Sequence, residues 1–390
     1  MLLKYLYFAC GVAGFIHPGA LHTAQDLKRV RTHVHAGKEP WATAFKLLTQ
    51  SKHAQPDWVP SPVRTLVRGS RANYTDNFEQ AFRDTAAAYQ LSLRWHITRN
   101  DTYADAAVGI LNAWSSTLKE IQGTSDLYLA AGLYGYQFAN AGELMRSYNG
   151  WSADEQAALG TMLTDIFANR SRSFLDDHNN NPDIYHYYAN WDQCNIANLM
   201  AVGIFTDNQT MYDHAVDYLL TGPSNGAFPV FGVANYTEEG SCKTLTQGQE
   251  AGRDQAHSLL DMTLLGVIAQ QGYNQGDDLF ASYGNMVLNG AEYAAKYNVN
   301  QTVPYTLYES YEGNQTVISP KYRGDIRAGF ELLAAHYGVV KGLNASWSES
   351  YRDYVNRNTK LGVEGGGGDY SNKSGGYDAL GHGTLMYRLR

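Results

Sequence analysis

The sequence predicts an all-α protein in which paired antiparallel helices form an incomplete α/α toroid. Apolar residues recur with the 3.6-residue period of a helix over most of the 390-residue chain. Short segments rich in Gly, Asn or Asp, such as residues 148–150 and 206–208, join many of these stretches, and short connections make helices antiparallel neighbours. The chain has no sequence period that would indicate a solenoid of repeats.

The helices can be assigned in order from their apolar stripes and their first residues. An apolar stripe runs from Phe78 to Leu93, and Asp76 is a candidate cap before it. Ser152 and Glu155 have the spacing of a capping box before a second stripe. Further helices are predicted at residues 23–35, 40–50, 103–119, 127–148, 190–205, 211–220, 255–271, 279–297, 329–339 and 346–357.

Four stretches interrupt the helical pattern. Residues 176–188 form a polar, aromatic loop, and residues 222–249 are rich in loop residues and allow short strands. Residues 300–323 are rich in tyrosine, and the glycine run at 365–368 indicates another loop. Long loops in a compact domain are usually functional or disordered, and Tyr, Asn and His favour binding. No linker divides the chain, so residues 15–390 are predicted to be one domain.

Composition excludes several classes of protein. The chain is 44% hydrophobic and 17% charged, which is enough apolar material for a core. The formal charge of −8 argues against a nucleic-acid partner. No apolar run approaches the roughly 20 residues of a membrane span. Tyrosine (29) outnumbers Phe (13) and Trp (7) together, which favours a surface where aromatic rings meet ligand and water. We expect a monomer.

The N-terminus has the pattern of a secretory signal peptide. Lys4 precedes an apolar stretch that ends in small residues, which predicts a signal over residues 1–14 and cleavage close to Phe15. The alternative is a buried first helix. Cys10 would leave with the signal, so that Cys194 and Cys242 remain as an even pair in an oxidising compartment, and we expect them to form a disulfide. Two free buried thiols are the alternative.

Sequons for N-glycosylation also favour secretion. Random placement of the residue types present would give roughly three Asn-x-Ser/Thr sequons. The chain has nine, which predicts a eukaryotic secreted glycoprotein, and we expect a fungal source. The acceptor residues are Asn73, Asn100, Asn169, Asn208, Asn235, Asn300, Asn314, Asn344 and Asn372.

The strongest candidate for chemistry is the run GQEAGRDQAH from Gly248 to His257, which enters a helix. Arg253, His257 and Asp261 are spaced by four residues and therefore share one helical face. A charged stripe at the start of a buried helix is costly unless its members are paired. The run is therefore either a structural Arg–Asp–His network or the wall of an active site that carries His257 and Arg253.

A second candidate is the segment YHYYANWDQCN, residues 185–195. Asn190 either caps the following helix or donates its amide to a substrate carboxylate. His186 and Trp191 are candidate substrate-binding residues. A Cys194–Cys242 bond would bring this segment close to the GQEAGRDQAH run.

The third candidate is the tyrosine-rich loop. Tyr305, Tyr308 and Tyr311 are spaced by three residues, and each is either packed or a candidate phenol for proton transfer. Nearby Arg323 and Arg327 are candidate cations for a polyanion. Together with Arg253 and Lys321, these two predict a basic cleft.

Several common motifs are absent from the sequence. It contains no phosphate-binding Gly-Lys-Ser/Thr loop, no Gly-x-Ser-x-Gly elbow and no Cys-x-x-Cys pair. No two histidines stand four residues apart with an intervening glutamate, although His and Asp are plentiful near the second and third candidates. We assign no metal site.

With these motifs the sequence resembles the alginate-lyase superfamily of polysaccharide lyases. The GQEAGRDQAH run is the most specific element, and the matching pieces follow in order over nearly the whole mature chain. The resemblance implies an α/α toroid and β-elimination of a uronic acid polymer such as alginate or glucuronan. The other pieces are FIHPG at residues 15–19, Asn190-Trp191, Arg327 with Glu331, His336-Tyr337 and GHGTL at residues 381–385.

The resemblance also implies roles for individual residues. Donors that neutralise the uronate carboxylate stabilise the enolate-like transition state that forms when the C5 proton leaves. A base removes that proton and an acid protonates the leaving O4, and no cofactor is needed. In similar lyases an Asn–His pair neutralises the carboxylate, while Tyr and His transfer protons. By this resemblance Asn190 is the neutraliser, and Arg253 and His257 are site residues.

Two departures from the family pattern affect this assignment. This chain has Trp191 where several relatives have a histidine after the asparagine. The catalytic tyrosine has no fixed spacing, so Tyr308 and Tyr311 are the candidates and Tyr305 follows them.

Two other classes of function remain as alternatives. A glycoside hydrolase on the same kind of toroid would use two carboxylates, such as Asp192 with Glu250 or Asp254. A carbohydrate-binding glycoprotein with an inactive site is the third interpretation.

Overall fold

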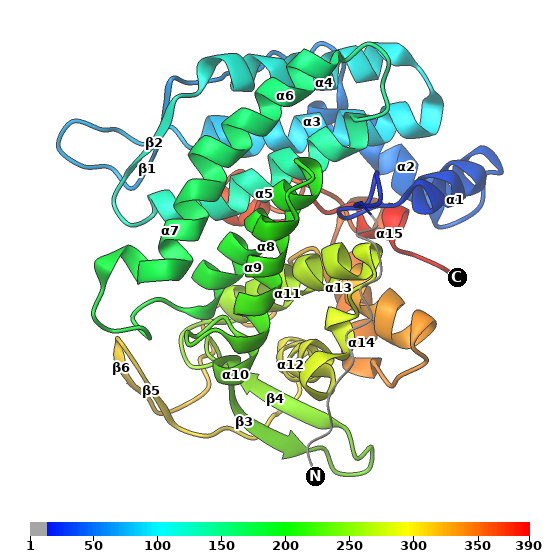
Figure 1. Ribbon diagram of the computed structural model, residues 1–390. Helices are drawn as coiled ribbons and strands as arrows, with labels where there is room; N and C mark the ends of the chain where they lie inside the picture. Colours follow the sequence, from blue (N-terminus) through cyan, green and yellow to red (C-terminus); the bar gives the residue numbers. More distant parts are fainter. Residues whose placement is uncertain (1–13) are drawn as a thin grey trace, which may run out of the picture.

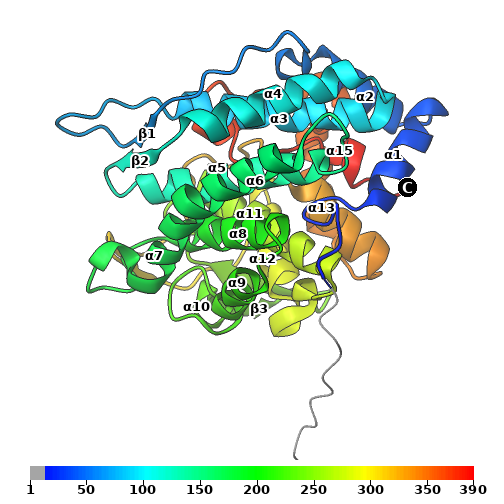
Figure 2. The same cartoon turned by 45° about the horizontal axis from the view of Figure 1, so that its top comes forward.

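The computed structural model describes residues 14–390, and its helices pack pairwise into an incomplete α/α toroid (Figures 1 and 2). All of the predicted signal peptide except Gly14 lies outside the described residues. One hydrophobic core cluster extends from Ala20 to Met386 and joins the helices into a continuous body.

The first half of the chain forms the upper part of Figure 1. Helices α3 and α4 pack against each other and are joined by only two residues, Arg99 and Asn100, which makes them antiparallel neighbours. The predicted capping box is confirmed, because Ser152 and Glu155 make both of its bonds at the start of α6. The helices here are α1 (Ala24–His35), α2 (Trp41–Gln50), α3 (Glu79–Thr98), α4 (Asp101–Thr117), α5 (Leu127–Met145), α6 (Ala153–Met162) and α7 (Asn169–Asp177).

The second half continues the incomplete toroid and carries the candidate segments. Helix α8 contacts α5, α9 and α11, and α12 contacts both α11 and α14. Figure 1 shows α8 and α11 in the middle of the molecule, with α12 and α14 below them. The helices are α8 (Ala189–Phe205), α9 (Gln209–Thr221), α10 (Phe228–Phe231), α11 (Gln255–Gln275), α12 (Ser282–Asn298), α13 (Phe330–Ala334), α14 (Ser346–Arg357) and α15 (Gly383–Met386).

Within residues 14–390, three two-stranded sheets lie in the segments between helices. The parallel pair β1 (Thr65–Arg68) and β2 (Glu120–Gly123) was not predicted, because strands of four residues show too little alternation to be recognised. Strands β3 (Gly232–Thr237) and β4 (Thr244–Gly248) form an antiparallel pair in the stretch where short strands were allowed. The tyrosine-rich loop folds into a hairpin of β5 (Tyr308–Ser310) and β6 (Gly313–Gln315).

Several predicted helix boundaries need correction. Asp76 does not cap α3, because the N-cap residue is Phe78 and no side chain caps this end. The stretch predicted at 279–297 is interrupted by three residues of positive φ, Tyr283 to Asn285, in the first turn of α12. The stretch predicted at 329–339 changes after Ala334 into a π-helical turn, Ala335–Val340.

The predicted Cys194–Cys242 disulfide is not formed, and both thiols are free. Cys194 is fully buried in α8, where its Sγ faces Gly132 of α5 and donates to the carbonyl oxygen of Trp191 at 3.2 Å. Cys242 is exposed in the turn between β3 and β4. A side chain at position 132 would collide with this thiol. The packing of α5 against α8, rather than a cross-link, therefore determines where Cys194 points.

Glu364 should make the stability of the fold depend on pH. It is buried and accepts the backbone N–H groups of Gly329 and Gly383, and burial together with Glu331 raises its pKa to about 8. The folded state therefore holds a proton that the unfolded state has released above the ordinary glutamate pKa of 4.5. Stability should fall by about 1.4 kcal/mol per pH unit between these two values and then level off.

Thermal melting of wild type and Glu364→Gln from pH 5 to pH 9 measures this effect. We expect the stability of the wild type relative to the variant to decline up to about pH 8, since glutamine cannot titrate. Glu155→Gln is the control, because hydrogen bonds from Ser152 lower the pKa of Glu155 and leave no slope in this range. Parallel curves for wild type and Glu364→Gln would contradict the prediction.

Candidate active site

The GQEAGRDQAH run forms the turn that joins β4 to α11. Asp254 is the N-cap of α11, and its carboxylate accepts the backbone N–H of His257. The backbone carbonyl of Glu250 accepts the N–H groups of Arg253 (3.0 Å) and Asp254 (3.2 Å) and so closes the turn. Through the side chain of Glu250, this turn contacts the first turn of α8, where Asn190 lies.

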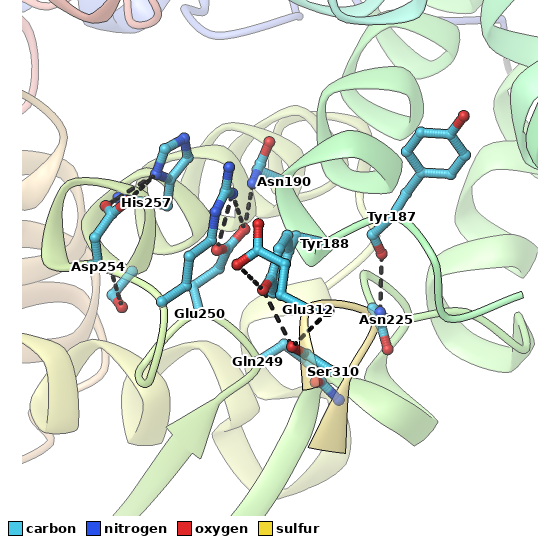
Figure 3. Close-up of polar contacts among 12 residues, drawn as sticks. Tyr187, Tyr188, Asn190, Asn225, Gln249, Glu250, Asp254, His257, Ser310 and Glu312 are labelled. Atoms are coloured by element: carbon cyan, nitrogen blue, oxygen red, sulfur yellow. Dashed lines mark hydrogen bonds and ion pairs between the residues drawn. The ribbon is translucent and has the colours of Figure 1, made fainter. Parts of the chain in front are cut away.

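Glu250 is at the centre of this arrangement. Its side chain is fully buried and accepts hydrogen bonds from the amide nitrogen of Asn190 and from Nη1 of Arg253, the latter at 3.1 and 3.3 Å. Burial raises the pKa of Glu250, and Arg253 and His257 oppose that shift. Figure 3 shows Glu250 between the Asp254–His257 pair on one side and Asn190 and Tyr188 on the other. Asn190 is itself buried, whereas Arg253 retains some exposure.

His257 and Asp254 form a second pair in the same turn. Both carboxylate oxygens of Asp254 lie within hydrogen-bond distance of His257 Nδ1, at 2.8 and 2.9 Å. Although burial opposes it, the contact with His257 holds the pKa of Asp254 below its ordinary value. A proton held on Nδ1 leaves Nε2 as an acceptor, and the His257 side chain is 33% exposed. The pair is therefore suited to proton abstraction by Nε2.

Tyr188 connects this turn to the β5–β6 hairpin. The guanidinium of Arg253 lies over its ring at 4.4 Å. Its hydroxyl lies 3.2 Å from Ser310 Oγ and 3.1 Å from Glu312, both in the hairpin (Figure 3). Tyr188 is buried, and burial raises its pKa. We call Tyr188, Asn190, Glu250, Arg253, Asp254 and His257 together the Arg253 cluster.

The structure separates the three candidate tyrosines by their environment. Tyr311 is 47% exposed and donates to Glu312 at 3.2 Å, and its ring lies 4.5 Å from that of His186. The hydroxyl of Tyr308 donates to the carbonyl of Gln249 at 2.5 Å and accepts the N–H of Gly252 at 3.0 Å. It therefore holds the hairpin against the turn.

Tyr305 also makes a structural contact, since its hydroxyl donates to the carbonyl of Gln315 at 2.9 Å. Burial raises the pKa of Tyr305 to about 12. Of the three candidates, only Tyr311 presents an accessible phenol whose hydroxyl bonds to a side chain rather than to the backbone.

Of the four cations predicted to form a basic cleft, only Arg253 lies in the Arg253 cluster, and the other three are engaged elsewhere. Arg327 is buried and pairs with Asp378 at 3.1 Å. Arg323 donates to the carbonyls of Tyr297 and Gln301, both at 2.8 Å, at the end of α12. Neither is bonded to the Arg253 cluster. The ammonium of Lys321 lies over the ring of its neighbour, Tyr322.

Trp191 lies in an aromatic group and is half-buried. Its ring centroid lies 4.7 Å from that of Tyr187 and 5.9 Å from that of Phe174. The indole therefore packs away from the position that Asn190 occupies, and it supports the loop before α8.

The carboxylates required by a glycoside hydrolase are occupied by other partners. Asp192 is fully buried and accepts bonds from His178 (2.8 Å), Ser224 (2.7 Å) and the backbone of Gly226 (2.8 Å). Glu250 binds Asn190 and Arg253, and Asp254 binds His257. No two of these carboxylates are left to flank a glycosidic bond, and the hydrolase interpretation is not favoured.

The sequence assigned no lyase role to four residues of this site, Tyr188, Glu250, Asp254 and Glu312. Glu250 and Tyr188 lie inside the quoted motifs, but their roles depend on contacts between α8, the β4–α11 turn and the hairpin. A signal for Glu250 was its place three residues before Arg253, which suits an ion pair. No sequence signal indicated Glu312.

The described residues meet neither the requirements of a metal site nor those of a membrane-spanning helix. Among residues 14–390, no group of three or more His, Cys, Asp or Glu side chains is placed to hold a metal ion. Over the same residues, no helix is both long and apolar enough to cross a membrane.

Solved structures of alginate lyases share this fold. Alginate lyase A1-III of Sphingomonas species A1 is 14% identical, with a TM-score of 0.60 over 97% of this chain and 98% of that one. An alginate lyase from Bacteroides ovatus is 11% identical, with a TM-score of 0.61 over 96% of this chain and 100% of that one. A variant of alginate lyase A1-III in complex with a tetrasaccharide is 13% identical, with a TM-score of 0.62 over 97% of this chain and 98% of that one.

Comparison of the sequence with models of protein families identifies the family. No curated protein matches the chain. The family model described as alginate lyase matches residues 32–303, a span that includes α8, the β4–α11 turn and the whole Arg253 cluster. With this match over more than half of its length, the chain belongs to the alginate lyase family.

Proposed function

We propose that this polysaccharide lyase cleaves a uronic acid polymer, such as alginate or glucuronan, by β-elimination. The observation that carries the proposal is the pairing of His257 Nδ1 with Asp254 next to an arginine that Glu250 holds in place. This arrangement supplies a base and a carboxylate-binding cation within one turn of the chain. Neighbouring structures of alginate lyases with bound tetrasaccharide support an acidic polysaccharide as substrate.

Arg253 and Asn190 would neutralise the uronate carboxylate. Nη1 of Arg253 bonds to Glu250, while Nε and Nη2 have no hydrogen bond to the described residues and can bind a carboxylate. The amide of Asn190 uses one N–H toward Glu250 and retains a second. Withdrawing charge from the carboxylate makes the C5 proton more acidic and stabilises the enolate-like transition state.

Two proton transfers complete the elimination. His257 Nε2 takes the C5 proton, the C5–H electron pair forms the C4–C5 double bond, and the C4–O4 bond breaks. Tyr311 donates its phenolic proton to the leaving O4, because burial and Glu312 raise the pKa of Tyr311 and keep it protonated. Solvent afterwards removes the proton from His257 and restores that of Tyr311.

The two hairpin tyrosines should respond differently to removal of the hydroxyl. We expect Tyr311→Phe to lower kcat by roughly 10²-fold or more, since a proton-transfer group is lost and the exposed ring stays. We expect Tyr308→Phe to retain turnover and to melt a few degrees lower, since the half-buried Gln249 carbonyl and Gly252 N–H lose their partner at a cost of about 1–3 kcal/mol. Full activity of Tyr311→Phe would remove it from the mechanism.

Product formation tests the proposed function directly. The enzyme is incubated with alginate, glucuronan and neutral glycans. Two signals are followed together: the ultraviolet absorbance of the alkene product and the concentration of reducing ends. A lyase raises both signals on a uronate polymer, a hydrolase raises only reducing ends, and a binding protein raises neither. An increase in reducing ends without the alkene signal would refute β-elimination.

We also propose that the protein is a secreted, monomeric glycoprotein. Eight of the sequon asparagines are exposed, and Asn208 is half-buried, which suits acceptors that must meet a glycosyltransferase. Treatment of secreted protein with an N-glycosidase should lower its mass, and size-exclusion chromatography should give a monomer. An unchanged mass would contradict the glycoprotein proposal. The exposed acceptors are Asn73, Asn100, Asn169, Asn235, Asn300, Asn314, Asn344 and Asn372.

A further inference from the structure

We propose that Glu250 is a positioning residue, whose carboxylate holds Arg253 and Asn190 as one carboxylate-binding unit. The inference rests on the proposed lyase function. Glu250 itself does not reach the substrate, because its side chain is fully buried beneath these two residues.

The geometry joins two elements that are far apart in sequence. Asn190 lies in the first turn of α8, whereas Arg253 lies in the turn before α11. Among the described residues, only the Glu250 side chain hydrogen-bonds to both: Asn190 Nδ2 donates to its Oε1, and Arg253 Nη1 lies 3.1 Å from Oε2. Because the guanidinium is planar, fixing Nη1 also fixes the direction of Nε and Nη2.

The side chain of Glu250 is not needed to build the turn. Its backbone carbonyl closes the turn by accepting the N–H groups of Arg253 and Asp254. The N-terminus of α11 is capped by Asp254. A substitution at Glu250 should preserve both of these features. The function of the buried carboxylate is therefore to bind Arg253 and Asn190.

A second buried acid, Asp261, lies on α11 but does not bond to Arg253. Asp261 is buried on α11, one turn beyond His257, and its Oδ1 has no hydrogen-bond partner among the described residues. Burial and the nearby charge of Glu250 raise the pKa of Asp261 well above its ordinary value. Among the described residues, Arg253 forms its ion pair with Glu250 and none with Asp261, so the orientation of the guanidinium depends on the Glu250 carboxylate.

A double-mutant cycle on the full-length protein tests the inference. The variants are Glu250→Gln, Arg253→Ala and the double variant, each assayed for alkene formation on the polymer that wild type cleaves best. We expect Glu250→Gln to lower kcat roughly 10- to 100-fold with a smaller change in KM, because a donor displaced by about 1 Å loses transition-state binding. In the Arg253→Ala background the same substitution should lower kcat by less than about threefold, since the effects of two residues that act through each other are not additive.

Glu250→Asp gives a second measurement if the glutamine variant does not fold. It keeps the charge but withdraws the carboxylate by one methylene, so the loss of kcat should be similar. Glu331→Gln is the matched control, since Glu331 is another buried glutamate that pairs with an arginine, Arg388 at 2.6 Å. We expect this control to lower the melting temperature and leave kcat unchanged.

The outcomes separate the two proposals. Equal costs of Glu250→Gln in the wild-type and Arg253→Ala backgrounds would overturn the positioning role while the lyase function stands. Wild-type turnover by Glu250→Gln or Glu250→Asp would do the same. Absence of alkene product from wild type on every uronate polymer would overturn the proposed function and, with it, this inference.

Discussion

Replacing His257 with alanine is expected to lower kcat by roughly 10²–10⁴-fold, the usual contribution of a proton-transfer group. The side chain is 33% exposed, and its Nδ1 is held by Asp254, so the loss should fall on turnover more than on the fold. Initial rates of alkene formation and thermal melting of the same preparations measure the two effects separately.

Asp254 gives a companion variant for this prediction. In Asp254→Asn the carboxylate that holds the Nδ1 proton is replaced by an amide, so the tautomer with a free Nε2 acceptor is no longer favoured. We expect a large loss of kcat here too, with little change in the melting temperature, because asparagine caps a helix about as well as aspartate does.

His214→Ala is the matched control for His257→Ala. His214 also has an aspartate neighbour, Asp176 at 3.8 Å, but it lies on α9 and does not contact the Arg253 cluster. Its removal should leave kcat unchanged. If His257→Ala turns over as fast as His214→Ala, the imidazole is not the base.

Replacing Arg253 with alanine is expected to lower kcat/KM by roughly 10²–10³-fold, the loss typical of one donor to a developing anion. The variant also leaves the buried Glu250 with only Asn190 as a bonded partner among the described residues, so a lower melting temperature should accompany the loss. Lysine at this position should recover only part of the activity, since one ammonium cannot bind Glu250 and a substrate carboxylate in the same planar geometry.

Arg83→Ala is the control for the arginine prediction. Arg83 likewise pairs with a glutamate, Glu79 at 2.6 Å, and lies over an aromatic ring, that of Phe82 at 5.7 Å. It lies on α3 and is not bonded to the cluster, so its loss should leave kcat/KM intact. Unchanged kcat/KM in Arg253→Ala would assign the carboxylate to Asn190 alone.

The architecture could be predicted from the sequence, because the helices and their pairing depend on patterns within short stretches of the chain. Apolar periodicity located most of the helices, and the Ser152–Glu155 capping box is formed as predicted. Short connectors such as Arg99-Asn100 made helices antiparallel neighbours, and this pairing leads to the toroid. The GQEAGRDQAH run also indicated where a site would lie. These features depend on residues within one or two helical turns of one another.

Which side chains meet depends on the assembled fold, because contacts between distant segments leave no local period in the sequence. Tyr308 and Tyr311 stand three residues apart, yet one phenol bonds to the backbone of the turn and the other is exposed. The even cysteine count predicted a bond that is not formed, since Cys194 is buried in α8 whereas Cys242 is exposed in the turn between β3 and β4. Arg327 was predicted to bind substrate, but in the fold its guanidinium is buried beside Asp378. A buried charge takes the partner that the fold places within reach, and that distance is a property of the assembled toroid.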